Sequence, residues 1–259
     1  MPLTTKEPAK DFDEIADDYA FFERHATEAE AGARAHLNEI AGVTPADGMV
    51  KFLDFGCGSG TFTARLLDQT DWPPSRLSLM LVDPAQSARR QAVSRLAPYT
   101  TFPIVESPTL PTAADAGFDV VLANHVLNYV PDLQRTVSQL RAVLAPAGVL
   151  LIAIGKQIDV FNEFLNYAFG LLGRASPYNC SDDVDAALRA VRANYDKHQV
   201  AFELSFPDSE ENRRRMLRFL LADHFAQMPH EPLMEWFNQF SRAGRIEIRS
   251  YSEHYVVRP

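Results

Sequence analysis

The sequence is poor in cysteine, lacks an excess of positive charge and contains no long apolar run. Its two cysteines, Cys57 and Cys180, are too few for a disulfide framework and lie in no metal-ligand pattern. We therefore expect no metal and a reduced, cytoplasmic protein. No apolar stretch is long enough to span a bilayer, and residues 1–7 lack the apolar core of a signal peptide, so we expect no membrane partner.

The charge balance is acidic, with a formal net charge of -9 and a pI near 5.3. An acidic surface disfavours phosphate backbones, so nucleic acid is not an expected partner, and a small molecule is the expected substrate. With 259 residues, of which 46% are hydrophobic and 23% charged, the chain can bury one substantial core. It contains no internal repeat or long linker, which predicts a single domain over 1–259. The sequence does not predict its oligomeric state.

A glycine-rich turn is the most informative segment. The apolar run 49–53 predicts a strand and 63–67 predicts a helix, with Gly56, Gly58 and Gly60 between them and Asp54 two residues ahead. Glycine lets the backbone approach a ligand closely, and a helix N-terminus offers free N–H groups. This turn is built to hold a nucleotide-like or amino-acid-like cofactor, although a tight turn without ligand is the simpler alternative. Cys57 inside it is predicted to be a small buried residue.

The spacing of these glycines differs from the G-x-G-x-x-G of dinucleotide-binding turns, which disfavours a dehydrogenase. The D-x-G-x-G-x-G arrangement resembles the first motif of class I S-adenosylmethionine (SAM) dependent methyltransferases. That resemblance covers about 52–154 and implies SAM as cofactor and S-adenosylhomocysteine as product.

Further cofactor residues are expected at the ends of the next strands. Asp83 follows the predicted strand 77–82, stands 23 positions after Gly60, and can accept hydrogen bonds from both ribose hydroxyls, with Pro84 beside it. After a third strand, 102–105, the class resemblance implies that Glu106 or Ser107 meets the adenine, although a solvated turn is nearly as good an interpretation. Asn124 follows the fourth strand, 117–123, and completes the predicted cofactor set.

Four polar or aromatic residues follow that fourth strand within six positions: Asn124, His125, Asn128 and Tyr129. A single histidine is most often a hydrogen-bonded structural residue. This group, however, lies at the carboxyl edge of a parallel sheet, where open α/β folds bind ligands. It therefore predicts a pocket.

The remaining pattern predicts a Rossmann-like α/β fold. Helices are expected over about 11–41, with Thr27 capping the second, and over 85–96, 157–172, 181–195 and 232–240. A fifth strand is expected over 149–154 and late strands over 198–206 and 245–257, with a capping box at Asp208 and Glu211 before another helix. The class resemblance implies seven strands with the last one antiparallel. We divide the chain into an N-terminal helical lid (1–48), a SAM-binding core (49–155), a helical cap after strand five (156–197), and C-terminal strands and helices (198–259).

A narrower resemblance is to the histamine N-methyltransferase family, through His25-Ala26-Thr27-Glu28, Val82-Asp83-Pro84, 127–130 and 181–183. This family methylates an imidazole ring nitrogen. The resemblance implies a substrate pocket that contains Tyr19, Phe22, Glu28, His125, Asn128 and Tyr129. The sequence departs from the family at Asn128, where a tyrosine is usual, and near Asn162 and Asn166, where tryptophans are usual. Its pocket therefore looks more polar than one for histamine.

The stretches 21–30, 54–60, 122–127 and 206–213 resemble the methyltransferase domain of ovothiol synthases and its stand-alone counterparts. That resemblance covers nearly the whole chain and implies methylation of an imidazole nitrogen of 5-thiohistidine in ovothiol biosynthesis. Another small natural product with an N or O acceptor is the alternative substrate. A SAM-binding but non-catalytic partner subunit is the alternative class.

The resemblance also implies roles for the pocket residues. Tyr129, Asn128 or His125 would set the tautomer of the acceptor imidazole, and His125 could act as base. Glu28 would bind the substrate ammonium or a ring N–H. Asn166, Tyr178 and an arginine are candidates for binding a substrate carboxylate.

Overall fold

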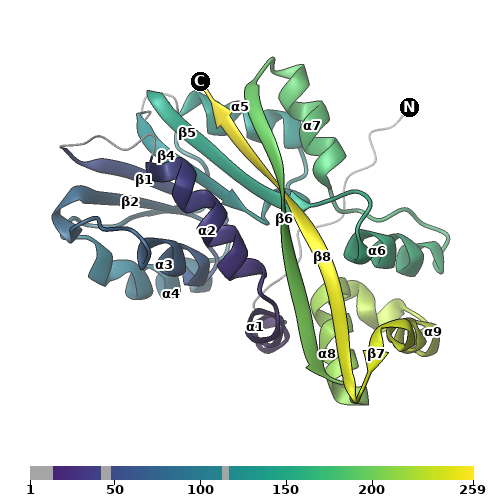
Figure 1. The fold of residues 1–259 in the computed structure, drawn as a ribbon. Helices are drawn as coiled ribbons and strands as arrows, with labels where there is room; N and C mark the ends of the chain where they lie inside the picture. The colour runs from purple at the N-terminus through teal and green to yellow at the C-terminus, as the bar shows by residue number, and fades with distance from the viewer. Residues whose placement is uncertain (1–13, 42–47, 113–116) are drawn as a thin grey trace.

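A computed structural model describes residues 14–41, 48–112 and 117–259, and it contains one eight-stranded sheet (Figure 1). The strand order is β3-β2-β1-β4-β5-β8-β6, and the short β7 pairs with β8. The strands are β1 (Val50–Phe55), β2 (Leu77–Val82), β3 (Val105–Ser107), β4 (Phe118–Asn124), β5 (Leu144–Gly155), β6 (Asn194–Pro207), β7 (Ser241–Arg242) and β8 (Arg245–Arg258).

The strands β1 to β5 are all parallel, and β8 runs antiparallel to both β5 and β6. The predicted Rossmann-like architecture with an antiparallel last strand is therefore confirmed. The two-residue β7 makes eight strands instead of the predicted seven. Because β1, β2 and β4 are parallel, their carboxyl ends meet at one edge, where Gly56, Asp83 and Asn124 lie.

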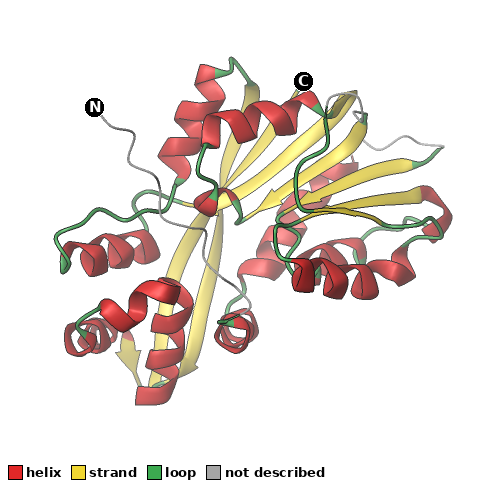
Figure 2. Ribbon diagram, turned by 180° about the vertical axis from the view of Figure 1, so that it is seen from behind, coloured by secondary structure: helices red, strands yellow, loops and turns green. Residues whose placement is uncertain are grey.

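Helices cover both faces of the sheet (Figure 2). On one face, α2 (Glu28–Ala41), α3 (Thr61–Leu67) and α4 (Gln86–Leu96) share an apolar core with alternate residues of the strands. On the other face, α5 (Leu133–Ala142) and α7 (Ser181–Ala190) bury the strand residues that alternate with those of the first core. Continuous apolar strands such as β5 are the pattern expected of strands that are buried on both faces.

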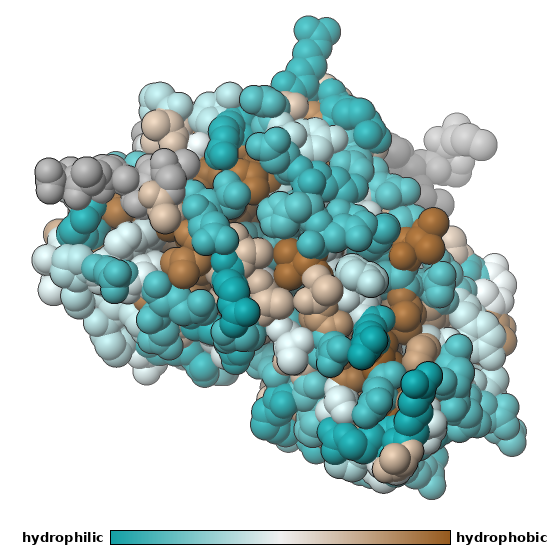
Figure 3. All heavy atoms as spheres, viewed as in Figure 1, coloured by the Kyte–Doolittle hydropathy of each residue, from teal (hydrophilic) through white to brown (hydrophobic). Residues whose placement is uncertain are grey.

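The ends of β6 and β8 extend beyond the sheet as a long antiparallel ribbon, which Figure 1 shows as the lower right part of the molecule. A third apolar core surrounds this ribbon, and we call it the ribbon lobe. Its helices are α1 (Ala16–His25), α6 (Val160–Gly170), α8 (Glu210–Leu221) and α9 (His230–Trp236). Figure 3, in the same view as Figure 1, shows a mainly hydrophilic surface with apolar clusters, some of them over the ribbon lobe.

Several local predictions need correction. The Thr27 side chain bonds to the backbone of Glu203 in β6 instead of capping α2. Ser209, not Asp208, caps α8, because the Asp208 carboxylate is paired with Arg213 at 2.6 Å. The third strand is Val105–Ser107 instead of 102–105, since it begins only where it pairs with β2. The predicted start of the first helix at about Asp11 lies outside the described residues.

The segment predicted as one helical cap divides between two cores. Asp159 caps α6, which packs into the ribbon lobe, whereas α7 packs on the sheet beside α5. The helix predicted to run to Tyr195 ends at Ala190, and Asn194 already begins β6. Period-two alternation from 198 onward marks the later part of this strand, but its first residues are mostly exposed, except Tyr195, and carry no such pattern.

Candidate active site

The glycine turn joins β1 to α3 at the carboxyl edge of the sheet. All three glycines have positive φ angles, of 75° at Gly56, 50° at Gly58 and 76° at Gly60. A Cβ on Gly56 would lie 2.2 Å from a methyl carbon of Val126, whereas a Cβ on Gly58 would meet nothing within 4 Å. Gly56 is therefore required by packing as well as by its backbone, and Gly58 leaves open space beside the turn.

Asp54 is buried behind this turn, and its carboxylate accepts a 2.5 Å hydrogen bond from the Thr63 hydroxyl. Burial raises the pKa of Asp54 to about 7, although the bond from Thr63 acts in the opposite direction. A cationic group beside this carboxylate would restore its charged form. The side chain therefore fits the neighbourhood of a positively charged ligand.

The Asp83 carboxylate links the turns that follow β1 and β2. One oxygen accepts from the Gly58 amide at 3.0 Å, and the other accepts from the Ala85 amide at 2.9 Å. Arg89, a buried residue of α4 that sequence reasoning missed, donates to the backbone oxygens of Asp83 and Pro84 and pairs with Glu106 at 3.3 Å. These contacts bring four predicted cofactor residues to one edge.

The two remaining cofactor candidates have different surroundings. The Ser107 hydroxyl is engaged in a local turn with the backbone of Thr109, so the solvated-turn interpretation describes its side chain. Asn124 ends β4, and its buried Oδ1 atom makes no well-aligned hydrogen bond among the described residues, although its side chain contacts His36. A buried oxygen with one weak contact can accept a further hydrogen bond.

His125 follows β4 in a left-handed conformation, with φ of 52°. Its amide bonds to Ala153 in β5 at 2.8 Å, and its Nε2 lies 3.5 Å from the Glu28 carboxylate at the start of α2. A left-handed non-glycine residue is strained, and such strain is concentrated at functional positions. The fold thus joins two predicted site residues that are nearly 100 positions apart in the chain.

Two half-buried tyrosines, Tyr19 and Tyr129, stand beside this pair. Burial raises the pKa of Tyr19 well above its usual value, and the nearby Glu23, Glu28 and Tyr129 raise it further. Burial also raises the pKa of Tyr129, with contributions from Tyr178 and Glu28. Both phenols are therefore neutral at physiological pH and can donate hydrogen bonds.

Tyr178 and two acidic residues that sequence reasoning missed complete this group. The ring of Tyr178 meets Tyr129 edge to face, with centroids 5.5 Å apart. Burial raises the pKa of Glu23, and burial raises that of Asp159 to about 6, with Glu28 contributing in both cases. Asp159 is the N-cap of α6, so its position in the sequence is already explained by the helix start and gives no sign of a role in the site. Glu23 lies one helical turn after Tyr19, which was the available signal.

Three predicted substrate residues have other surroundings. Asn128 donates to the backbone oxygen of Asn179, and its own backbone oxygen accepts from the Asn179 amide, so it ties two loops together. Phe22 is buried in the ribbon lobe against Phe161 and Phe219. Asn166 is exposed on α6. A direct substrate contact for these three residues remains a prediction.

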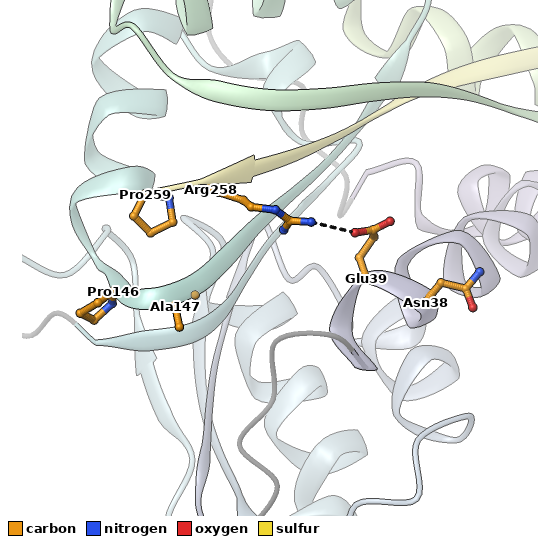
Figure 4. A pocket seen from close by; sticks show the side chains of 7 residues that line it. Asn38, Glu39, Pro146, Ala147, Arg258 and Pro259 are labelled. Atoms are coloured by element: carbon orange, nitrogen blue, oxygen red, sulfur yellow. Dashed lines mark hydrogen bonds and ion pairs between the residues drawn. The ribbon is translucent and has the colours of Figure 1, made fainter.

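A pocket of about 460 Å³ opens at the other edge of the sheet, between the end of α2 and the start of β5 (Figure 4). Arg258 and Glu39 face each other across it at 3.4 Å. It lies at the amino ends of the parallel strands, away from the glycine turn. In the described part of the chain, no group of three or more His, Cys, Asp or Glu side chains is arranged to hold a metal ion. Within the same residues, every helix is too short or too polar to cross a membrane.

The sequence comparisons agree with this geometry. Residues 53–150 match the family described as "Methyltransferase domain". The trans-aconitate 2-methyltransferase of Rhodopseudomonas palustris (strain BisB18) is 32% identical over 144 residues, which are 56% of this chain and 51% of that protein. The chain spans about half the length of the curated relatives it matches.

Two solved structures share the fold. A methyltransferase of undemonstrated function from Bacillus halodurans has a TM-score of 0.54 at 15% identity, and the match covers 87% of this chain and 99% of that one. The plantazolicin methyltransferase BpumL has a TM-score of 0.55 at 12% identity, over 95% and 89% of the two chains.

The fold, the glycine turn and the family match define the class of this domain. Residues 53–150 match a methyltransferase domain, and the strand order and directions of the sheet are those predicted for a class I SAM-dependent methyltransferase. SAM is the cofactor of that domain. The names of these relatives mention no imidazole substrate. The substrate of this protein is therefore a proposal, which is argued below.

Proposed function

We propose that this protein transfers a methyl group from SAM to an imidazole ring nitrogen of a small, cationic, amino-acid-like substrate, with 5-thiohistidine as the first candidate. The observation that carries the proposal is the His125–Glu28 pair, at 3.5 Å, which stands with neutral Tyr19 and Tyr129 at the carboxyl edge of the sheet. A base, a carboxylate and two phenol donors are what an N–H heterocycle needs for orientation and proton removal.

The cofactor residues fit SAM. Open space at Gly58 admits a ligand against the backbone, and the Asp83 carboxylate stands at the end of β2, where ribose hydroxyls are bound in folds of this type. Glu106, paired with Arg89, stays a candidate for the adenine end. When bound, SAM supplies an electrophilic methyl group on a sulfonium.

Three acidic residues lie on the acceptor side, and two arginines, Arg65 and Arg95, act electrostatically on one of them, Glu23. Glu23, Glu28 and Asp159 interact electrostatically with one another or with Tyr19. An ammonium group would be attracted to this cluster and would lower the raised pKa values of its carboxylic acids. A polycarboxylate such as trans-aconitate would be repelled, so the substrate in that relative's name is not our first candidate for this chain.

The chemistry asked of the protein is alignment and proton removal. Methyl transfer is an in-line displacement, so holding the acceptor nitrogen at near-attack distance supplies much of the rate. Tyr129 and Tyr19 would donate to the substrate and fix its position. His125 would accept the ring proton while Glu28 stabilises the resulting imidazolium. Tyr178 would extend the polar wall toward a substrate carboxylate.

The test is to incubate the protein with SAM and a panel of 5-thiohistidine, histidine, histamine, simple phenols and trans-aconitate. Mass spectrometry then reports the gain of one methyl group and the release of S-adenosylhomocysteine. We expect methylation on the imidazole nitrogen of a substrate that carries an ammonium group. Methylation of a phenol or carboxylate alone would indicate another small natural product, and SAM binding without any turnover would indicate a non-catalytic partner subunit.

Two variants locate the chemistry in the acceptor site. Glu28→Gln and Tyr129→Phe should each lower kcat/KM for the imidazole substrate at least about tenfold and leave SAM affinity unchanged. Glu163→Gln, on the exposed side of α6, is the matched control. Full turnover in both site variants would contradict the acceptor-site assignment.

A further inference from the structure

A row of polar residues crosses the sheet on the face that α2 covers. The strand registers place Asn124 of β4 opposite Ala153 of β5, Ala153 opposite His254 of β8, and His254 opposite His198 of β6. Residues in register on neighbouring strands share one face of a sheet. His36 of α2 lies over this row, with its ring centroid 4.7 Å from that of His254.

The buried part of this row is short of hydrogen-bond partners. His36 and His254 are each only 1% exposed. Among the described residues, neither ring nitrogen of His254 has a hydrogen-bond partner, and the Asn124 Oδ1 atom and His36 Nε2 make no well-aligned hydrogen bond beyond the contact between those two side chains. Each unpaired buried polar atom costs about 1–3 kcal/mol, yet neighbouring positions on this face are apolar, as at Leu151 and Val256. Water molecules with several polar partners are the usual occupants of such a site.

The row also connects two environments. At its inner end, Asn124 adjoins His125, which contacts Glu28 in the acceptor site. At its outer end, His198 is exposed on the edge strand β6, with its ring centroid 5.7 Å from that of His254. Burial lowers the pKa of His36 to about 3 and that of His254 to about 2, with neighbouring histidines acting in the same direction and the Asn124 side chain, which hydrogen-bonds to His36, acting in the opposite one. Neutral imidazoles each present one donor and one acceptor, as a proton relay requires.

We propose that this histidine row, completed by water, conducts the proton released in methyl transfer from His125 through His36 and His254 to His198 and solvent. The inference rests on the proposed transfer to an N–H acceptor. In that transfer a bond between the acceptor nitrogen and the methyl carbon would form as the methyl–sulfur bond of SAM breaks, and the electron pair of the broken bond would stay on sulfur as a thioether lone pair. The acceptor proton passes to His125, and one proton reaches bulk solvent for each turnover.

The test compares His254→Phe, at the buried centre, with His198→Gln, at the exposed end, where a folding defect is not expected. In weak buffer we expect kcat to fall at least about tenfold in both variants, with SAM affinity unchanged. High concentrations of imidazole buffer should restore turnover, because a small base would replace the relay. His230→Gln, in the ribbon lobe, is the matched control, since its ring stacks on Phe225 outside the row.

A crystal structure or water–protein nuclear Overhauser effects give a readout besides activity: ordered water should bridge Asn124, His36 and His254. A dry row, or unchanged kcat in both His254→Phe and His198→Gln at low buffer, would overturn the relay while leaving the methyltransferase proposal intact. Absence of methyl transfer by the unaltered protein overturns the proposed function itself.

Discussion

The cofactor edge and the ribbon lobe hold the two halves of the proposed reaction in different ways. Asp54, the glycines and Asp83 come from two consecutive strand–turn units, and short backbone hydrogen bonds fix them. Tyr19, Glu28, His125, Tyr129 and Asp159 come from segments spread over about 140 positions: α1 and the start of α6 in the ribbon lobe, the start of α2, and the loop after β4 at the edge of the sheet. A local motif therefore specifies the cofactor, whereas the substrate depends on how distant elements pack.

Gly56→Ala should give the largest effect and damage the cofactor edge as a whole. Its new Cβ would collide with Val126 and would force a left-handed alanine, for a loss of about 2–5 kcal/mol in the free energy of unfolding. Gly58→Ala, with open space around it, should lose only about 1 kcal/mol but bind SAM at least tenfold more weakly. Urea unfolding and calorimetric titration measure the two quantities. Equal stability losses in both variants would refute this division of roles.

Asp54→Asn should separate stability from function at the same edge. The pKa of Asp54 in the folded protein, about 7, lies above its unfolded value. The contribution of this carboxyl group to the free energy of unfolding is therefore fully present below about pH 4 and is lost as the pH rises through 7. At pH 8 the variant should be more stable than the parent protein by about 2 kcal/mol, which is roughly half of the free energy that corresponds to the pKa shift. Near pH 4 the two proteins should be equally stable. SAM should bind it more weakly. Equal free energies of unfolding for the variant and the parent protein at both pH values would contradict the raised pKa of the buried Asp54 carboxylate.

Asp83→Asn should weaken SAM binding about tenfold, because one charged acceptor for the ribose is lost. The asparagine oxygen can still accept from Gly58 or Ala85, so the fold should persist. Acceptor KM should stay constant at saturating SAM. Unchanged SAM affinity would show that Asp83 acts only on the turn.

Asp18→Asn should give the smallest effect and affect the ribbon lobe alone. The buried Asp18 carboxylate binds Arg218 at 2.7 Å and Arg215 at 3.3 Å, which anchors α1 to α8. Both arginines are partly exposed, so the stability loss should be only about 1 kcal/mol. Because α1 carries Tyr19 and Glu23, acceptor KM should rise while SAM affinity stays constant. Arg214→Gln, whose partner Glu210 is exposed, is the matched control.

Sequence patterns predicted most of the Rossmann-like half correctly. The second strand was predicted over 77–82 and is Leu77–Val82, because a continuous apolar strand with turn residues on both sides has one good arrangement in a parallel sheet. The ribbon lobe was harder to predict, since amphipathic helices such as α6 and α8 do not reveal which apolar surface they cover. Thr27, predicted as a cap, instead bonds to β6, a strand more than 170 residues later.

The sequence by itself indicated the cofactor class, since three alternate glycines after a strand specify a left-handed turn, and at Gly58 that turn leaves open space for a ligand. It also placed Asp83 and Asn124 at strand ends, because the end of a parallel strand is a local property. Only the tertiary structure brought Glu28 to His125 and aligned His198, His254 and Asn124 across four strands. Those contacts depend on strand register and helix packing, which no short stretch of sequence encodes.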